Sequence, residues 1–291
     1  MTKTTATTDA PKPVTKTTTA GEGGFNAKYT YAEQGETYYN DGRELDLLSH
    51  IFSLPHLHSL RNNPPAILHE IDLFATRRYL MNIGSLKGRI ITTLLATHAP
   101  RTSIELGGYV GYSTILFASA VRDAVGPEAR YYCVEANPVF AAIIMALVDL
   151  AGLRDTVRVL VGESTMWIKK LEQDRVLENG KVDFLFLDHV KSMYTRDLKV
   201  LESLGMVKEG AVLVADNMVK PGNPEYHRWV NAAPEEKRGM VEKTKGRGEP
   251  ANVVDGLEGD PELSYTSEWV ESWEPQGVRD AIEITRVLGR G

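Results

Sequence analysis

The sequence has only one cysteine, Cys133, and no hydrophobic run long enough to cross a membrane. A single cysteine excludes an internal disulfide and favours a reducing compartment. The most apolar stretch, residues 140–150, is interrupted by Asp149 and is shorter than the roughly 20 residues of a transmembrane helix. The N-terminal region lacks an apolar signal core and has no arginine before Arg43, which argues against a secretory or transit peptide. We therefore expect a cytoplasmic protein with no membrane partner.

An excess of positive charge is also missing. The 291 residues include 33 Lys+Arg and 39 Asp+Glu, a formal net charge of −6. A nucleic-acid partner is not expected, because such proteins carry a basic footprint. With 42% hydrophobic and 25% charged residues, the composition is that of a soluble globular protein.

The first 24 residues consist mostly of Thr, Lys, Ala, Pro and Gly, and have few apolar side chains. Such a segment cannot offset the entropy of ordering, so we predict a disordered tail over residues 1–24. Residues 25–291 are expected to form a single domain. A polar insertion near residues 221–262 interrupts it; a lid or a partner site is possible there, and a tolerated surface insertion is the simplest interpretation.

From Arg101 onward, short apolar runs alternate with helical patterns, which is typical of βα units and a parallel sheet. Two apolar runs near the C-terminus have no helix between them and predict an antiparallel hairpin at one edge. The fold class is therefore α/β: a Rossmann-like, doubly wound, seven-stranded sheet, mostly parallel, preceded by N-terminal helices. The predicted strands are 103–106, 130–135, 157–161, 182–187, 211–215, 264–271 and 278–287, and the predicted helices are 44–54, 65–80, 85–97, 112–124, 137–151, 164–175 and 192–204.

A glycine-rich turn, Gly107-Gly108-Tyr109-Val110-Gly111, follows the first strand of the sheet and opens a helix. Ligands of α/β sheets bind at this end of the strands, and glycines allow the backbone to approach them closely. Glu105 just before the turn suits a positively charged cofactor, and Glu135 at the end of the second strand can accept hydrogen bonds from a ribose. These acids indicate S-adenosylmethionine. NAD is the alternative cofactor, and a mere tight turn with a helix-capping Glu135 is the structural alternative.

Oxygen ligands for a metal follow two strands that are expected to be neighbours. Asp188 ends the fourth strand, and Asp216 and Asn217 end the fifth. Two carboxylates and an amide oxygen suit Mg²⁺, which keeps several water positions. The alternative is that both aspartates cap helices. Lys191, three residues after Asp188, is a candidate general base, with an ordinary surface lysine as the alternative.

Together these residues resemble the catechol O-methyltransferase family of magnesium-dependent, S-adenosylmethionine-dependent enzymes. The resemblance spans residues 47–286. The motifs that carry it are Met81-Asn82-Ile83-Gly84 with Lys87-Gly88, the Glu105–Ser113 turn, Glu135-Ala136-Asn137-Pro138, Gly162-Glu163-Ser164, Leu187-Asp188-His189-Val190-Lys191, and Ala215-Asp216-Asn217 followed by Pro221-Gly222.

The resemblance implies a role for each matching residue. Asp188, Asp216 and Asn217 match the magnesium ligands, and Lys191 matches the residue that deprotonates the substrate hydroxyl. Glu271 matches the acid that contacts the second hydroxyl of a catechol, although Glu268 lies nearby and the spacing differs. The matching cofactor contacts are Met81, Ile83, Glu105, Gly107, Tyr109, Ser113, Glu135, Ala136, Ser164, Asp188 and His189.

The sequence departs from the family pattern beside the substrate. Val190 stands where the family has a tryptophan that walls the aromatic ring, and Tyr79 is the nearest match to an aromatic gatekeeper. Both changes predict a more open pocket.

The predicted activity is O-methylation of a small molecule with a vicinal dihydroxy aromatic ring, such as a catechol. A caffeoyl-coenzyme-A-type methyltransferase is the second interpretation, and basic residues of the insertion could then hold the coenzyme phosphates. These residues are Lys237, Arg238, Lys243, Lys245 and Arg247. The third interpretation is a non-catalytic S-adenosylmethionine-binding protein. The oligomeric state is not predicted.

Overall fold

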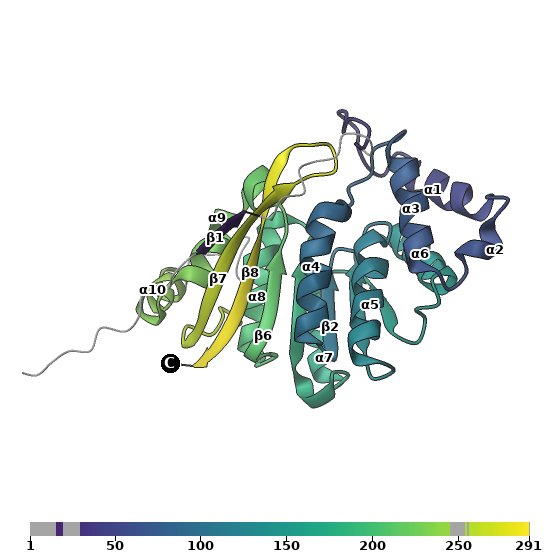
Figure 1. Cartoon of the computed structure of the whole chain (residues 1–291). Coiled ribbons are helices and arrows are strands. Elements are labelled where there is room, and N and C mark those ends of the chain that lie inside the picture. The colour runs from purple at the N-terminus through teal and green to yellow at the C-terminus, as the bar shows by residue number, and fades with distance from the viewer. Residues whose placement is uncertain (1–15, 20–29, 245–253, 255, 291) are drawn as a thin grey trace, which may run out of the picture.

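A mostly parallel sheet forms the centre of the computed structural model, which describes residues 16–19, 30–244, 254 and 256–290. The strand order is β1-β7-β8-β6-β5-β2-β3-β4. Strands β4, β3, β2, β5 and β6 run parallel, and β8 and β7 add an antiparallel hairpin at one side (Figure 1). The strands are β1 (Lys16–Thr19), β2 (Thr102–Leu106), β3 (Arg130–Glu135), β4 (Val157–Val161), β5 (Val182–Leu187), β6 (Val207–Ala215), β7 (Leu263–Trp273) and β8 (Arg279–Arg290). The predicted Rossmann-like arrangement of seven strands is confirmed.

Strand β1 is an eighth strand that the sequence did not predict. It pairs in parallel with the outer edge of β7, Lys16 opposite Glu268 and Thr19 opposite Glu271. The prediction of a disordered tail is therefore wrong for residues 16–19; residues 1–15 and 20–24 lie outside the described residues. An edge strand presents unpaired backbone N–H and C=O groups, so a segment without an apolar pattern can still pair with it.

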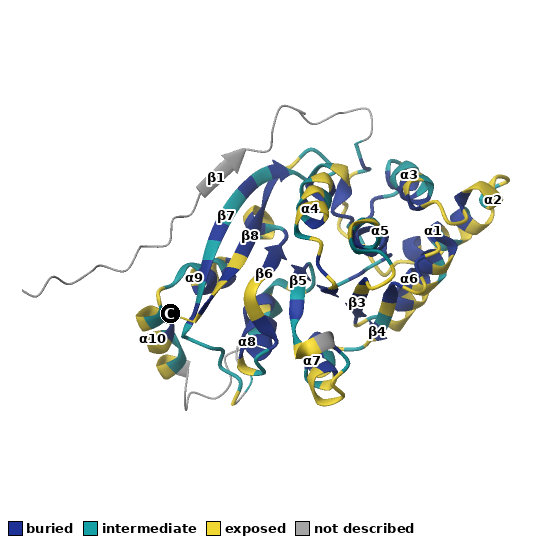
Figure 2. Cartoon of the chain, turned by 60° about the horizontal axis from the view of Figure 1, so that its bottom comes forward, coloured by how far each residue is buried: buried dark blue, intermediate teal, exposed yellow. Residues whose placement is uncertain are grey.

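Helices cover both faces of the sheet, as expected for βα units. The helices are α1 (Arg43–Phe52), α2 (Leu57–Leu60), α3 (Pro64–Ala75), α4 (Gly84–His98), α5 (Tyr112–Val125), α6 (Pro138–Leu150), α7 (Ser164–Gln173), α8 (Tyr194–Ser203), α9 (Pro224–Asn231) and α10 (Pro234–Thr244). Alternate residues of β5 separate the two layers: Phe184 and Phe186 pack in the core with α1, α3, α4, α5 and α6, and Leu185 and Leu187 pack with α7, α8 and α9. Figure 2 shows the buried residues concentrated in the strands and the inward helix faces. No helix among the described residues combines the length and hydropathy that crossing a membrane would require.

The segment that was expected to be a surface insertion is packed into the fold over much of its length. Tyr226, Trp229 and Val230 of α9 are buried against the α8 side of the sheet. Lys237 of α10 is also buried, and its ammonium group donates a hydrogen bond to the carbonyl of Leu263 at 2.6 Å. The prediction of a tolerated surface insertion is wrong for α9, because its apolar face completes the core. Residues 245–253 and 255 lie outside the described part.

Candidate active site

The turn after β2 needs glycine for close packing. Gly107 has a positive φ of 93°, and a Cβ built there would lie 2.6 Å from the carbonyl oxygen of Asp188. A Cβ at Gly108 would lie 2.4 Å from the Cys133 Sγ atom. Any side chain at these positions would therefore displace the ends of β3 or β5. The turn places Tyr109, which also has a positive φ, and the buried Ser113 at the start of α5.

Glu105 is a fully buried carboxyl group directly below this turn. Its Oε2 accepts a hydrogen bond from the Thr114 hydroxyl at 2.6 Å, and Oε1 has no hydrogen-bond partner within the described part of the chain. Burial raises the pKa of Glu105 to about 7. A buried acceptor without a donor is costly, so this oxygen favours a ligand that brings an N–H or O–H group.

Glu135 joins the end of β3 to the glycine turn. Its Oε2 accepts hydrogen bonds from the backbone N–H groups of Gly108 (3.1 Å) and Tyr109 (2.9 Å), and Oε1 accepts one from that of Asn137 (2.8 Å). The side chain that caps α6 is Asn137, so the helix-capping interpretation of Glu135 is wrong. Ala136 follows it and is exposed.

Asp197 of α8, which the sequence analysis did not single out, binds two of the predicted cofactor contacts, Ser164 and His189. Its buried carboxylate accepts hydrogen bonds from His189 Nε2 at 2.8 Å and from the Ser164 hydroxyl, and Thr165 donates to it at 2.5 Å. Burial lowers the pKa of His189, so the ring is neutral and its Nε2 carries the proton given to Asp197. The other ring nitrogen, Nδ1, is a buried acceptor that lacks a partner among the described residues.

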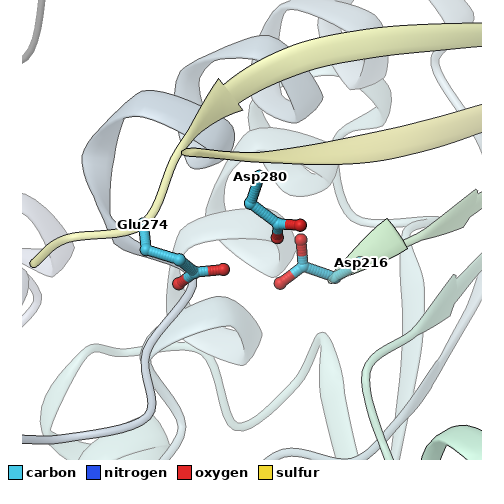
Figure 3. A group of neighbouring side chains, drawn as sticks. All are labelled: Asp216, Glu274 and Asp280. Atoms are coloured by element: carbon cyan, nitrogen blue, oxygen red, sulfur yellow. The ribbon is translucent and has the colours of Figure 1, made fainter. Parts of the chain in front are cut away.

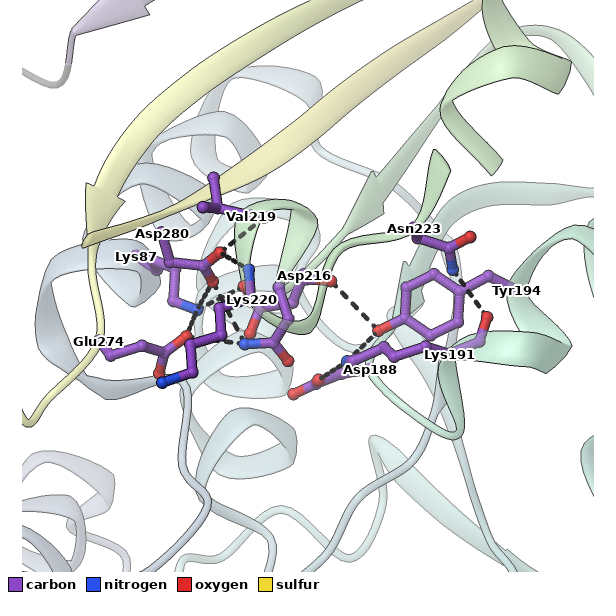
Figure 4. A network of polar contacts seen from close by, with 11 residues as sticks. Lys87, Asp188, Lys191, Tyr194, Asp216, Val219, Lys220, Asn223, Glu274 and Asp280 are labelled. Carbon is purple, nitrogen blue, oxygen red and sulfur yellow. Dashed lines mark hydrogen bonds and ion pairs between the residues drawn. The ribbon is translucent and has the colours of Figure 1, made fainter. Parts of the chain in front are cut away.

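Lys191 and Asp188 form a contact pair at the end of β5. The Lys191 ammonium lies 3.0 Å from Asp188 Oδ1 and donates to the Tyr194 hydroxyl at 2.5 Å. The backbone carbonyl of Lys191 accepts a hydrogen bond from Asn223 Nδ2 at 2.7 Å, so the start of α9 holds this turn (Figure 4). Burial raises the pKa of Asp188, against the opposing effect of Lys191. The surface-lysine interpretation is not supported, since the Lys191 side chain is only 21% exposed.

Asp216 and Asn217 follow β6 beside β5, as predicted. Neither Asp188 nor Asp216 caps a helix by its side chain: Val190 precedes the short 3₁₀ helix Lys191–Met193, and Asn217 precedes the helical turn Met218–Gly222. The helix-cap alternative is therefore wrong for both aspartates. Asp216 instead lies in a cluster with Glu274 and Asp280, whose carboxylate oxygens are within 4.8 Å of one another (Figure 3).

The acid beside Asn217 is Glu274, which the sequence analysis did not single out. Asn217 Nδ2 donates to Glu274 Oε1 at 2.7 Å, whereas Glu271 lies inside β7, opposite Ala281 of β8. Glu274 is the first residue beyond β7, which ends at Trp273. A direct contact between Glu271 and substrate stays a prediction.

The remaining predicted residues lie around the same end of the sheet. Met81 and the buried Ile83 precede α4, and a Cβ at Gly84 would lie 2.4 Å from Pro275 of the β7–β8 turn. Tyr109 donates its hydroxyl hydrogen to Glu44 Oε1 at 2.9 Å, which connects the glycine turn to α1. Val190 is 64% exposed, consistent with an open wall at this position.

The chain is similar to known proteins in both sequence and structure. Residues 104–218 match the family model of a methyltransferase domain. The chain is 33% identical over 217 residues to a catechol O-methyltransferase of Bos taurus, covering 74% of this chain and 75% of that protein. It is 34% identical over 204 residues to the catechol O-methyltransferase of Mus musculus, covering 69% and 73%.

The fold is shared with more distant methyltransferases. An O-methyltransferase from Bacillus cereus, solved in complex with SAH, superposes with a TM-score of 0.50 at 19% identity, covering 87% of this chain and 94% of that one. At this identity the likeness concerns the fold alone. The relatives in sequence establish more: the chain is a methyltransferase and belongs to the catechol O-methyltransferase family.

Proposed function

We propose that this protein transfers the methyl group of S-adenosylmethionine to one hydroxyl of a catechol-type small molecule, in a magnesium-dependent reaction. One observation supports the proposal: Asp188 and Lys191 follow β5, and Asp216 and Asn217 follow the neighbouring parallel strand β6. The glycine turn after β2, the neighbour of β5, opens at the same sheet edge. The glycine turn, where the cofactor would bind, is thereby adjacent to the acidic residues and Lys191, where metal and substrate would bind.

The residues around the turn fit S-adenosylmethionine. Glu105 Oε1 and His189 Nδ1 are buried acceptors without protein donors in the described chain. The cofactor carries donors of the matching kind, namely an ammonium group, two ribose hydroxyls and an adenine amino group. Its net positive charge also suits the carboxylates of Glu105 and Glu135.

The acidic subsite fits Mg²⁺. Asp188, Asp216 and Asn217 offer two carboxylates and an amide oxygen, the hard ligands that this ion prefers. When bound, the ion would lower the pKa of a substrate hydroxyl and help hold both oxygens of a vicinal diol. A divalent cation would also stabilise the ionised form of Asp188, which burial disfavours.

Lys191 is positioned to accept the substrate proton. The Lys191 ammonium would first give up a proton; the substrate proton then moves from the hydroxyl to Nζ, the oxygen attacks the methyl carbon, and the C–S bond breaks to leave S-adenosylhomocysteine. Asp188 and Tyr194 hold Nζ in place through contacts of 3.0 and 2.5 Å. Charge is neutralised as the methyl group moves, so a pocket that excludes water favours the transfer.

The test is mass spectrometry of reactions with S-adenosylmethionine and a panel of catechols, with Mg²⁺ or with a chelator. We expect a product about 14 Da heavier, one CH₂, that requires Mg²⁺. Monophenols of the same size are the matched substrates and should not react. Equal product with chelator would contradict the metal dependence, and binding of the cofactor without any product would favour the non-catalytic alternative.

The structure weakens the argument for a caffeoyl-coenzyme-A-type methyltransferase. Of the basic residues proposed to hold coenzyme phosphates, Lys237 is buried and bonded to the Leu263 carbonyl, and Arg238 pairs with Glu235 at 2.9 Å. Lys245 and Arg247 lie outside the described residues. A cytoplasmic location, expected from the sequence, stays a prediction.

A further inference from the structure

A buried ionic cluster lies directly behind the proposed magnesium ligands. Lys87 of α4 has no exposed surface, and its ammonium group donates to Asp216 Oδ1 (2.6 Å), Glu274 Oε1 (2.6 Å) and Asp280 Oδ2 (3.0 Å) (Figure 4). These contacts use all the donors of an ammonium group. The Lys87 ammonium group is thus the cation between the three acids. It bonds to only one of the two carboxylate oxygens of Asp216.

Asp280, at the start of β8, connects this cluster to the loop after β6. Its Oδ1 accepts hydrogen bonds from the backbone N–H groups of Val219 (2.9 Å) and Lys220 (3.2 Å). Its Oδ2 accepts from Lys87 Nζ (3.0 Å) and from Asn217 Nδ2 (3.2 Å). The carboxylate is fully buried, so each of these contacts holds it in one orientation.

The contacts of Asp280 and Glu274 fix the orientation of the Asn217 amide. Both oxygens of Asp280 already accept hydrogen bonds from N–H donors, so the group of Asn217 that faces Asp280 at 3.2 Å must be its NH₂ group, which also lies 2.7 Å from Glu274 Oε1. The amide oxygen, on the opposite side of the planar group, then points away from the two acids. Only this oxygen can bind a metal ion; the flipped amide would present hydrogens to it.

We propose that Asp280 is a positioning residue of the metal site, which fixes the Asn217 amide with its oxygen turned to the metal, while Lys87 occupies the place between Asp216, Glu274 and Asp280. This inference rests on the proposed magnesium-dependent function. A purely structural network would explain the burial equally well, but it would not require the Asn217 amide among its members. Groups that orient metal ligands typically change metal affinity by about 10–100-fold when they are replaced.

Two isosteric variants test the orientation of the Asn217 amide. In Asp280→Asn, the side-chain oxygen of the new asparagine still accepts from the N–H groups of Val219 and Lys220. Its NH₂ group therefore faces Asn217 Nδ2, and the Asn217 amide loses this acceptor. In Glu274→Gln, the side-chain oxygen can still accept from Asn217. Glu202→Gln controls for general destabilisation: Glu202 is another buried carboxylate, accepts a hydrogen bond from Trp229 Nε1 at 2.9 Å, and lies near the C-terminal end of α8, whereas Tyr194 of the site starts that helix.

The experiment is calorimetric titration of Mg²⁺ into the folded variants saturated with S-adenosylmethionine, with melting temperatures measured in parallel. We expect Asp280→Asn to weaken Mg²⁺ binding about 10–100-fold, and Glu274→Gln and Glu202→Gln to weaken it several-fold less. Equal losses in Asp280→Asn and Glu274→Gln would overturn the proposal in favour of a charge effect, and unchanged binding in Asp280→Asn would overturn it outright. Failure of the unsubstituted protein to bind Mg²⁺ would instead reject the proposed function.

Discussion

Single side chains decide the chemistry at the edge of the sheet. Lys191 Nζ is held between Asp188 and the Tyr194 hydroxyl, and the Asn223 amide holds the Lys191 carbonyl. Backbone and side chain of the proposed base are therefore both fixed before a substrate binds. Such fixed geometry lowers the barrier to proton transfer because little reorganisation remains.

We expect Lys191→Met to lower kcat by about 10²–10⁴-fold, the usual contribution of a general base. Methionine keeps the length and most of the volume of the lysine stem. S-Adenosylmethionine affinity should stay within a factor of a few, because the predicted cofactor contacts Tyr109 and His189 are held by Glu135 and Asp197 and not by Lys191. Steady-state kinetics and a cofactor titration measure the two effects, with Lys170→Met, an exposed lysine of α7, as the control. An unchanged kcat would remove Lys191 from the role.

Glu105 predicts a pH dependence of the stability of the ligand-free protein. Burial raises its pKa to about 7 from an ordinary value of 4.5. Between these pH values the folded protein binds more protons at Glu105 than the unfolded chain, so this group lowers stability as the pH rises. The loss is fully developed above pH 7 and amounts to at most about 3 kcal/mol.

Urea unfolding at pH 5 and pH 8, without cofactor or metal, tests this expectation. Glu105→Gln cannot ionise, so its free energy of unfolding should fall less than that of the unsubstituted protein between the two pH values. Parallel pH dependences in the two proteins would show that Glu105 does not titrate in this range.

At the scale of elements, α9 is attached to the core by Trp229 and to the site by Asn223. Trp229 is buried, donates its indole N–H to Glu202 at 2.9 Å, and has the Lys199 ammonium 4.2 Å from its ring centre. Asn223 caps α9 by accepting a hydrogen bond from the Tyr226 N–H at 3.2 Å. Helix α9 therefore connects the core to the turn that carries Lys191.

We expect Trp229→Ala to lower the free energy of unfolding by about 3–5 kcal/mol, the typical effect of emptying a buried aromatic site. Arg228→Ala is the matched control in the same helix, since Arg228 is exposed and its ion pair with Glu236 spans 3.9 Å; it should change stability by no more than about 0.5 kcal/mol. Chemical unfolding of both variants measures the difference. Similar small effects would mean that α9 is not part of the cooperative core.

On the scale of the whole molecule, the proposed cofactor subsite is assembled from elements that are far apart in the chain. The ends of β2 and β3 supply Glu105 and Glu135, and the starts of α7 and α8 supply Ser164 and Asp197. A ligand that bridges these elements binds only the folded state. It therefore stabilises the molecule against global unfolding by mass action.

S-Adenosylmethionine at 100 times its Kd should add about 2.7 kcal/mol to the free energy of unfolding. Asp197→Asn should reduce this gain at the same concentration, since the single oxygen of an amide can no longer accept from Ser164, Thr165 and His189 together. Thermal or chemical unfolding with and without ligand gives the gain, and methionine at the same concentration is the control. An equal gain in the variant would exclude Asp197 from cofactor binding.

The sequence by itself determined the layered α/β fold, since hydrophobic periodicity distinguishes strands from helices. It also placed Asp188 and Asp216 at one edge, because parallel strands put their carboxyl ends on the same side. Pairing across the chain was decided only by tertiary structure. Lys87 meets Asp280 across 193 residues, and the register of β7 with β8 turns Glu274 rather than Glu271 toward Asn217. A shift of one residue in the pairing of two strands moves every side chain of a strand to the opposite face of the sheet. The local sequence pattern does not fix the register of β7 with β8, so it could not predict which acid faces Asn217.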